Sequence, residues 1–130
     1  EMTILSIESC FIDLSYSKSI LLSNPLLVKI INSYFEYNMN NCIQIKYSVQ
    51  DQEQRGNNKN PISSIFISGN NFSKNYGNCV YIEGQSQVKP STGESCGFQK
   101  VKIICQKNSF IKNKCNGLFV NNMNKTKLLI

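Results

Sequence analysis

The motif F-x-x-N occurs three times in the chain, as Phe35-Glu-Tyr-Asn38, Phe72-Ser-Lys-Asn75 and Phe110-Ile-Lys-Asn113. The surroundings of the motif repeat as well. An aliphatic residue stands seven positions before each phenylalanine, at Val28, Ile65 and Ile103. Repetition of a short pattern every few tens of residues is typical of proteins that stack copies of one small structural unit. The chain is therefore expected to be a repeat protein.

Each repeat contains two short runs in which every second residue is apolar, a period typical of strands, and no stretch sustains a helical stripe. The second run follows the asparagine, as in Ile43-x-Ile45, Val80-x-Ile82 and Leu118-x-Val120. A unit this small cannot enclose its own core, so the copies must stack and share one. We predict an all-β fold, a right-handed parallel β-helix (solenoid) of about four coils, for residues 1–130 as a single module. Long loop insertions are expected at Ser48 to Asn60 and at Gln85 to Gly97.

Stacking would place equivalent residues of successive coils about 4.8 Å apart. Two columns are then expected, an internal aromatic stack of Phe35, Phe72 and Phe110 and a corner ladder of Asn38, Asn75 and Asn113. A degenerate fourth copy is predicted upstream, with Phe11 in the phenylalanine position and Ile4 seven residues before it. In that alignment its second strand, Ile20 to Leu22, is displaced by one residue. The start at Glu1 and the final apolar run predict a piece of a longer chain.

The repeats resemble the F-x-x-N and G-G-A-I repeats of chlamydial polymorphic outer-membrane proteins and related parallel β-helix surface proteins of microbes. The second half of the pattern stands as Asn41-Cys42-Ile43, Asn78-Cys79-Val80 and Asn116-Gly117-Leu118. The resemblance covers roughly Leu26 to Val120, and departs from the family at Cys42 and Cys79, where a small residue is usual. It implies a secreted or surface-displayed protein with adhesive or structural work, and it carries over no catalytic residue.

The charge of the chain does not indicate a nucleic-acid partner. The net charge is +6, but the basic residues are scattered lysines with Arg55 as the sole arginine. Proteins that bind nucleic acid usually concentrate Arg or Lys on one face, so we expect no nucleic-acid binding. The longest apolar stretch, Ile20 to Ile31, is interrupted by polar residues and is too short to cross a bilayer, so no membrane insertion is expected within this segment.

An enzyme is not expected either. The chain has no histidine, which excludes Ser-His and Cys-His nucleophiles within it. Polysaccharide lyases and hydrolases use carboxylates gathered on one face. In the alignment on Phe11, Asp13 and Glu36 fall at different repeat positions, and no two acidic residues stack on neighbouring coils. We predict no cofactor and no metal. A carbohydrate-binding or polysaccharide-cleaving module remains the alternative.

Six cysteines in a small chain without histidine or a close C-x-x-C pair favour disulfides and an oxidising compartment. Cys42 and Cys79 occupy equivalent positions, and Cys115 lies two positions short of the equivalent place in the third copy. Staples between coils are expected among these three, with a local Cys96–Cys105 pair also open. A buried free thiol is the alternative for Cys105. The disulfide candidates are all six: Cys10, Cys42, Cys79, Cys96, Cys105 and Cys115.

Two N-glycosylation sequons are present, Asn71-Phe72-Ser73 and Asn124-Lys125-Thr126. Asn71 precedes an inward phenylalanine, so alternation predicts that it faces outward. Apolar side chains are also expected to face outward at Phe66, Ile104, Tyr81 and Phe119, and Leu5 is placed in the same outward column as Phe66.

Either the long loops cover these outward apolar side chains, or the side chains form a contact surface for a neighbouring subunit or for sugar rings. We therefore predict a secreted or cell-surface structural and adhesive module that binds other surface proteins, glycans or further copies of itself. The strand edges at the two ends of the stack are expected to be covered either by further coils of a longer parent chain or by other copies that join end to end into a filament or surface coat.

Overall fold

The computed structural model describes residues 3–13, 15, 19–48, 62–84, 101–121 and 127–130. The described part is all-β, with no helix. Its strands are β1 (Thr3–Glu8), β2 (Phe11–Asp13), β3 (Ile20–Ser23), β4 (Pro25–Ile31), β5 (Tyr34–Glu36), β6 (Ile43–Tyr47), β7 (Ser63–Ser68), β8 (Asn71–Ser73), β9 (Val80–Gly84), β10 (Val101–Gln106), β11 (Ser109–Ile111), β12 (Leu118–Asn121) and β13 (Lys127–Leu129). Most of the two predicted long loops, Asn124 and Cys96 lie outside the described residues.

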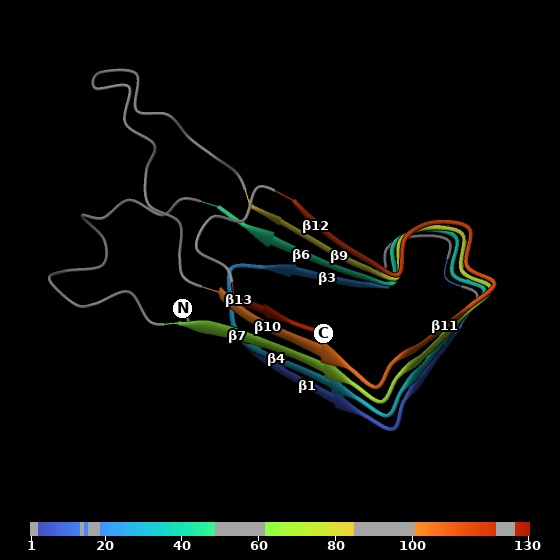
Figure 1. Cartoon of the computed structure of the whole chain (residues 1–130), viewed down its shortest axis with the longest axis horizontal. Coiled ribbons are helices and arrows are strands. Elements are labelled where there is room, and N and C mark those ends of the chain that lie inside the picture. Colours follow the sequence, from blue (N-terminus) through green and yellow to red (C-terminus); the bar gives the residue numbers. More distant parts are fainter. Residues whose placement is uncertain (1–2, 14, 16–18, 49–61, 85–100, 122–126) are drawn as a thin grey trace, which may run out of the picture.

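Three parallel sheets form the architecture, and each takes one strand in turn from successive stretches of the chain (Figure 1). Sheet A has the order β1-β4-β7-β10-β13, sheet B the order β11-β8-β5-β2 and sheet C the order β12-β9-β6-β3. Each set of three consecutive strands is one layer of a stack, and we call these layers units 1 to 4, starting with β1, β4, β7 and β10. The arrangement is compatible with a parallel β-solenoid.

Strand register confirms the alignment of the three complete copies. Phe72 of β8 lies between Phe35 of β5 and Phe110 of β11. Ile65 of β7 likewise lies between Val28 and Ile103. The recurrence of motif residues therefore reports their stacking in space.

The predicted alignment of the first copy was wrong by one residue. Ile12, and not Phe11, pairs with Phe35, and Leu5 pairs with Val28. Ile20 then pairs with Ile43, so the second strand is not displaced. A slip of one residue in a strand exchanges its inward and outward faces. Phe11 is consequently an outward residue of sheet B, 59% exposed, and the outward partner of Lys29 and Phe66 on sheet A is Ser6, not Leu5.

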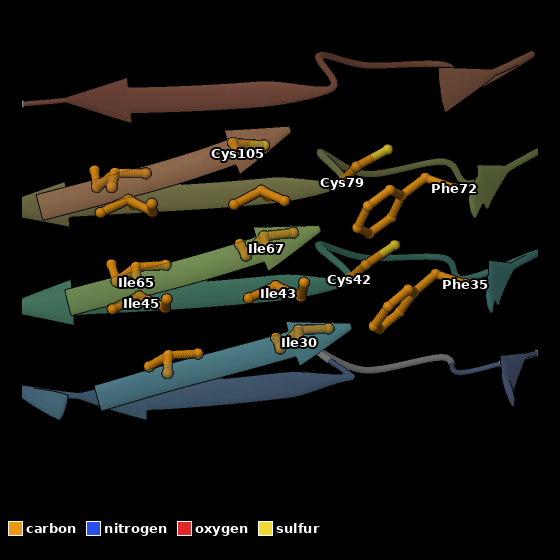
Figure 2. Packing of buried hydrophobic residues seen from close by; sticks show 14 of the residues in the cluster. Ile30, Phe35, Cys42, Ile43, Ile45, Ile65, Ile67, Phe72, Cys79 and Cys105 are labelled. Atoms are coloured by element: carbon orange, nitrogen blue, oxygen red, sulfur yellow. The ribbon is translucent and has the colours of Figure 1, made fainter. Parts of the chain in front are cut away.

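The core lies between the sheets and is filled by the inward residues of units 2, 3 and 4 (Figure 2). The Phe35 and Phe72 rings are fully buried and stack with centroids 4.8 Å apart. Phe110 continues the stack at 5.2 Å from Phe72 but is 41% exposed. No further strand of the described part covers β11, so the aromatic column ends at an open face.

The corners repeat as regularly as the strands do. Four residues in equivalent positions between sheets A and B adopt positive φ, namely Ser9, Asn32, Gly69 and Lys107. A second such column follows sheet B, at Tyr37, Lys74 and Lys112. Left-handed backbone is uncommon for residues other than glycine and asparagine. Its recurrence at lysine and tyrosine shows that the stacked neighbours, and not the local residue, impose the turn.

Candidate functional site

The asparagines of the motif form a continuous hydrogen-bonded ladder at the corner after sheet B. Asn38 Nδ2 donates to Asn75 Oδ1 at 2.9 Å, and Asn75 Nδ2 donates to Asn113 Oδ1 at 3.0 Å. Asn75 Nδ2 also donates to the carbonyl of Phe35 at 2.8 Å, and the backbone N–H of Asn38 donates to Asn75 Oδ1 at 3.0 Å. Asn38 and Asn75 therefore each join three consecutive units, and Asn113 joins two, so the ladder satisfies buried corner backbone that no strand pairs.

Two further ladders run beside the first, and the sequence analysis missed them. In the corner before sheet B, Asn70 Nδ2 donates to Asn108 Oδ1 at 3.1 Å, and Asn70 Oδ1 accepts the backbone N–H of Ser33. Before sheet C, Asn78 Nδ2 donates to Asn41 Oδ1 at 3.2 Å. The signal was present in the sequence, because these asparagines recur at the same spacing as the motif.

The first two ladders have different ends in the first and last units. Unit 1 has Cys10 and Ser15 at the positions where the later units have an asparagine or Ser33. No asparagine side chain therefore continues these ladders into unit 1. Unit 4 retains Asn108 and Asn113. The two ends of the described stack therefore differ, because the asparagine ladders reach unit 4 but do not reach unit 1.

The disulfide prediction is not borne out in the described residues. Five of the six cysteines are described, and all five are free thiols. Cys42 and Cys79 are fully buried and lie one above the other with their side chains pointing the same way (Figure 2). A disulfide needs its two Cβ atoms close together and its S–S bond turned across them, a geometry that parallel in-register side chains do not offer. Cys105 is buried, which agrees with the free-thiol alternative.

The thiols of Cys79 and Cys105 are kept protonated by their surroundings. A hydrogen bond with the Cys42 side chain, together with burial, raises the pKa of the Cys79 thiol far above its ordinary value. Burial also raises the pKa of Cys105, although Asn108 Nδ2 donates to its sulfur at 3.3 Å. Because the thiolate is the reactive form, these cysteines should be inert in the folded protein.

We expect iodoacetamide at pH 8 to modify Cys10 and Cys115, which are exposed, and to leave Cys42, Cys79 and Cys105 unmodified until the protein is unfolded. Peptide mass spectrometry before and after addition of urea measures this. The control is the same experiment after treatment with a reductant. If Cys42 and Cys79 resisted modification in urea but became reactive after reduction, a disulfide between them would be present and the structure would be contradicted.

The four residues of the predicted contact surface fall on two sheets. Phe66 and Ile104 are partners on sheet A, and both are half-buried. Tyr81 and Phe119 are partners on sheet C, and their rings stack with centroids 5.2 Å apart. The four therefore form two separate apolar pairs on different faces.

The carboxylate argument from the sequence was also wrong, for the same one-residue reason. Asp13 of β2 and Glu36 of β5 are direct partners across sheet B, both on its outer face. They are the acidic pair that the alignment on Phe11 had separated. Within the described part of the chain, no three His, Cys, Asp or Glu residues gather into a group able to hold a metal ion.

A shallow pocket of about 290 Å³ lies on the outer face of sheet B next to these carboxylates. Phe11 and Tyr34 are partners on adjacent strands, with ring centroids 6.0 Å apart. The pocket is lined by Phe11, Tyr34, Phe35, Glu36, Asn71 and Ser73. Sequence reasoning missed it, because placing Phe11 inside the core removed one of its two aromatic rings.

Asn71 lies in the wall of this pocket. Its side chain faces outward from β8, as alternation predicts, but the residue is half-buried. Its Oδ1 atom is buried and has no hydrogen-bond partner. An acceptor in this state is unfavourable by roughly 1–3 kcal/mol. Asn71 Oδ1 is one of two buried side-chain atoms that the described structure leaves without a partner, the other being Gln44 Oε1 on sheet C.

No family model, curated protein or solved structure matches this chain. No helix of the described part is long and apolar enough to cross a membrane. The fold and the ladders define the class of the protein as an all-β repeat protein of stacked parallel strands.

Proposed function

We propose that the chain is a structural and adhesive module of a secreted or cell-surface protein, a right-handed parallel β-helix whose stacked units form a stiff rod. Three asparagine ladders and a phenylalanine stack run along the stack and support rigidity. The resemblance of the repeats to those of polymorphic outer-membrane proteins favours the same role. Glycosylation at Asn124 belongs to this proposal. At Asn71 the residue is half-buried and its Oδ1 atom is buried, so we propose that this sequon carries no glycan.

The observation that carries the proposal is the open face of unit 4. Phe110 exposes much of its ring there, and the edges of β11 and β12 have no strand beside them in the described part. On sheet A, β13 covers only three residues of β10, whereas β7 pairs with six. Unit 1 presents a complementary face, because its inward Ile12 and Ile20 are only partly buried.

The occupant we propose for this face is the first unit of a second copy. Its β2 and β3 would pair with β11 and β12, and its β1 would replace the short β13 contact. Unpaired strand edges favour such addition. Repeated head-to-tail, this contact gives an open filament, because the same two faces meet at every joint.

Sedimentation velocity at increasing protein concentration tests this proposal. We expect the wild-type chain to form oligomers that grow with concentration, and we expect Phe110→Lys to remain monomeric because a charge then faces the joint. The matched control is Ile111→Lys, since Ile111 is the next residue of β11, is similarly exposed and points away from the core. A wild-type chain that stays monomeric, or equal assembly by the two variants, would contradict end-to-end stacking.

A further inference from the structure

We propose that the pocket on the outer face of sheet B binds a neutral oligosaccharide, with its chain running along the stack of units. The site is distinct from the open face of unit 4 and does not depend on assembly. Phe11 and Tyr34 would stack on sugar rings, while Glu36 and Asn71 accept hydrogen bonds from sugar hydroxyls. The proposal rests on the shape, exposure and chemistry of these four side chains.

The aromatic wall is the first support. Phe11 is 59% exposed and Tyr34 is 53% exposed, and their rings lie nearly parallel, with an interplanar angle of 27°. Large aromatic side chains side by side on an open sheet face are costly unless they meet a partner. Flat aromatic faces suit the C–H faces of sugar rings, which are themselves apolar on one side and polar at the edge.

The acceptors are the second support. Asn71 Oδ1 is buried without a partner, and Glu36 lies in the same lining. A ligand hydroxyl that reached this amide would satisfy a group which the protein itself leaves unpaired. Hydroxyls are strong donors to carboxylates as well. The pocket therefore offers acceptors to the hydroxyl donors that a sugar carries.

The charge of the pocket favours a neutral ligand over an anionic one. Glu36 and Asp13 are partners on adjacent strands, so an acidic sugar would meet two carboxylates. Lys74, which lies beside Glu36, is already engaged: its Nζ donates to Tyr37 Oη at 2.8 Å and lies 3.8 Å from Glu36 Oε1. A cationic ligand is disfavoured in turn, because Lys74 partly neutralises Glu36 and the unpaired acceptor belongs to a neutral amide.

The direction of the ligand follows from the register. Phe11, Tyr34 and Asn71 are successive partners on β2, β5 and β8, so the wall extends over three units. A single sugar would contact only part of it. A linear oligosaccharide lying along the stack would contact all three residues.

The test uses the whole chain produced without glycosylation, so that Asn71 carries no glycan. It is titrated with neutral hexasaccharides of cellulose, mannan and chitin, and with hexagalacturonate and chitosan hexamer as the anionic and cationic probes. We expect at least one neutral probe to bind and to shift the amide NMR signals of Phe11, Tyr34 and Asn71. Tyr34→Ala should weaken that binding about tenfold or more, and Glu36→Gln should weaken it severalfold.

The control is Tyr81→Ala, which removes another stacked tyrosine from sheet C and should leave the affinity unchanged. Three results would overturn the proposal: no shift at these residues with any neutral probe, tighter binding of a charged probe, or equal affinity of the Tyr34→Ala variant and wild type. A glycan found on Asn71 in natively secreted protein would also overturn it, because the pocket would then be occupied by a covalently attached sugar.

Discussion

Replacement of Asn75 by alanine is expected to destabilise the folded protein by at least about 3 kcal/mol, since several buried polar groups lose their partner at once and each costs about 1–3 kcal/mol. Asn75 is fully buried in unit 3. Its Oδ1 accepts from both the backbone N–H and the side chain of Asn38, and its Nδ2 donates to the carbonyl of Phe35 and to Asn113. Alanine replaces none of these bonds.

Urea unfolding followed by circular dichroism measures this loss. A domain of this size is stable by only about 5–15 kcal/mol, so the midpoint should shift far toward lower urea. The matched control is Asn40→Ala, because Asn40 is exposed and its Oδ1 accepts a hydrogen bond from the backbone N–H of its neighbour Asn41. That variant should lose no more than about 0.5 kcal/mol. Equal losses in the two variants would show that the ladder does not hold the units together.

Replacement of Phe72 by alanine is the second large effect, with an expected loss of about 3–5 kcal/mol, the usual range for removal of a buried aromatic ring. Phe72 is fully buried between the rings of Phe35 and Phe110. The cavity would lie between layers of the stack, where neighbouring strands are held in register and cannot collapse into it. Loss of two ring contacts adds to the cost.

Phe110→Ala supplies the comparison, because it removes the same motif residue from the last unit. Among the described residues Phe110 stacks on one ring, that of Phe72, and it is already 41% exposed. Its loss should be about half that of Phe72→Ala or less, since less apolar surface returns to water. Thermal and urea unfolding of the two variants measure the difference. The measurement uses dilute protein, because end-to-end assembly at high concentration would cover the Phe110 ring. Equal losses of stability in dilute protein would mean that the end of the aromatic column is covered in solution even without assembly.

The complete repeats could be predicted because stacking makes equivalent residues obey the same constraint. An inward position must be apolar in every unit, and a buried corner must carry a polar side chain that satisfies its backbone, so Phe35 and Asn38 recur in recognisable form. The same logic would have found the ladders of Asn70 and Asn78, whose spacing is equally regular. Recurrence at a fixed interval was sufficient evidence for a column in each case.

The first unit was harder, because within the described residues it has a stacked neighbour on one side only and its constraints are weaker. In unit 1, Ile12 occupies the position of the motif phenylalanine and Ser15 the position of the motif asparagine. Because Phe11 is the aromatic residue nearest to that position, the repeats were aligned on Phe11 instead of Ile12. This single slip hid both features of the candidate site. It removed Phe11 from the outer face, and it separated Asp13 from Glu36.

The sequence by itself determined that the chain stacks parallel strands, which residues of the three complete units face inward, and which asparagines stand at their corners. Burial recurs at equivalent positions of every unit, so the residue types at those positions recur in the sequence. Tertiary structure alone decided the register of unit 1, the free state of the described cysteines and the pocket on sheet B. Those features depend on which strands lie side by side and which way their side chains point, and outward residues carry little compositional trace of their neighbours. The F-x-x-N motif predicts the core of this protein, while its outer face is known only from the stack.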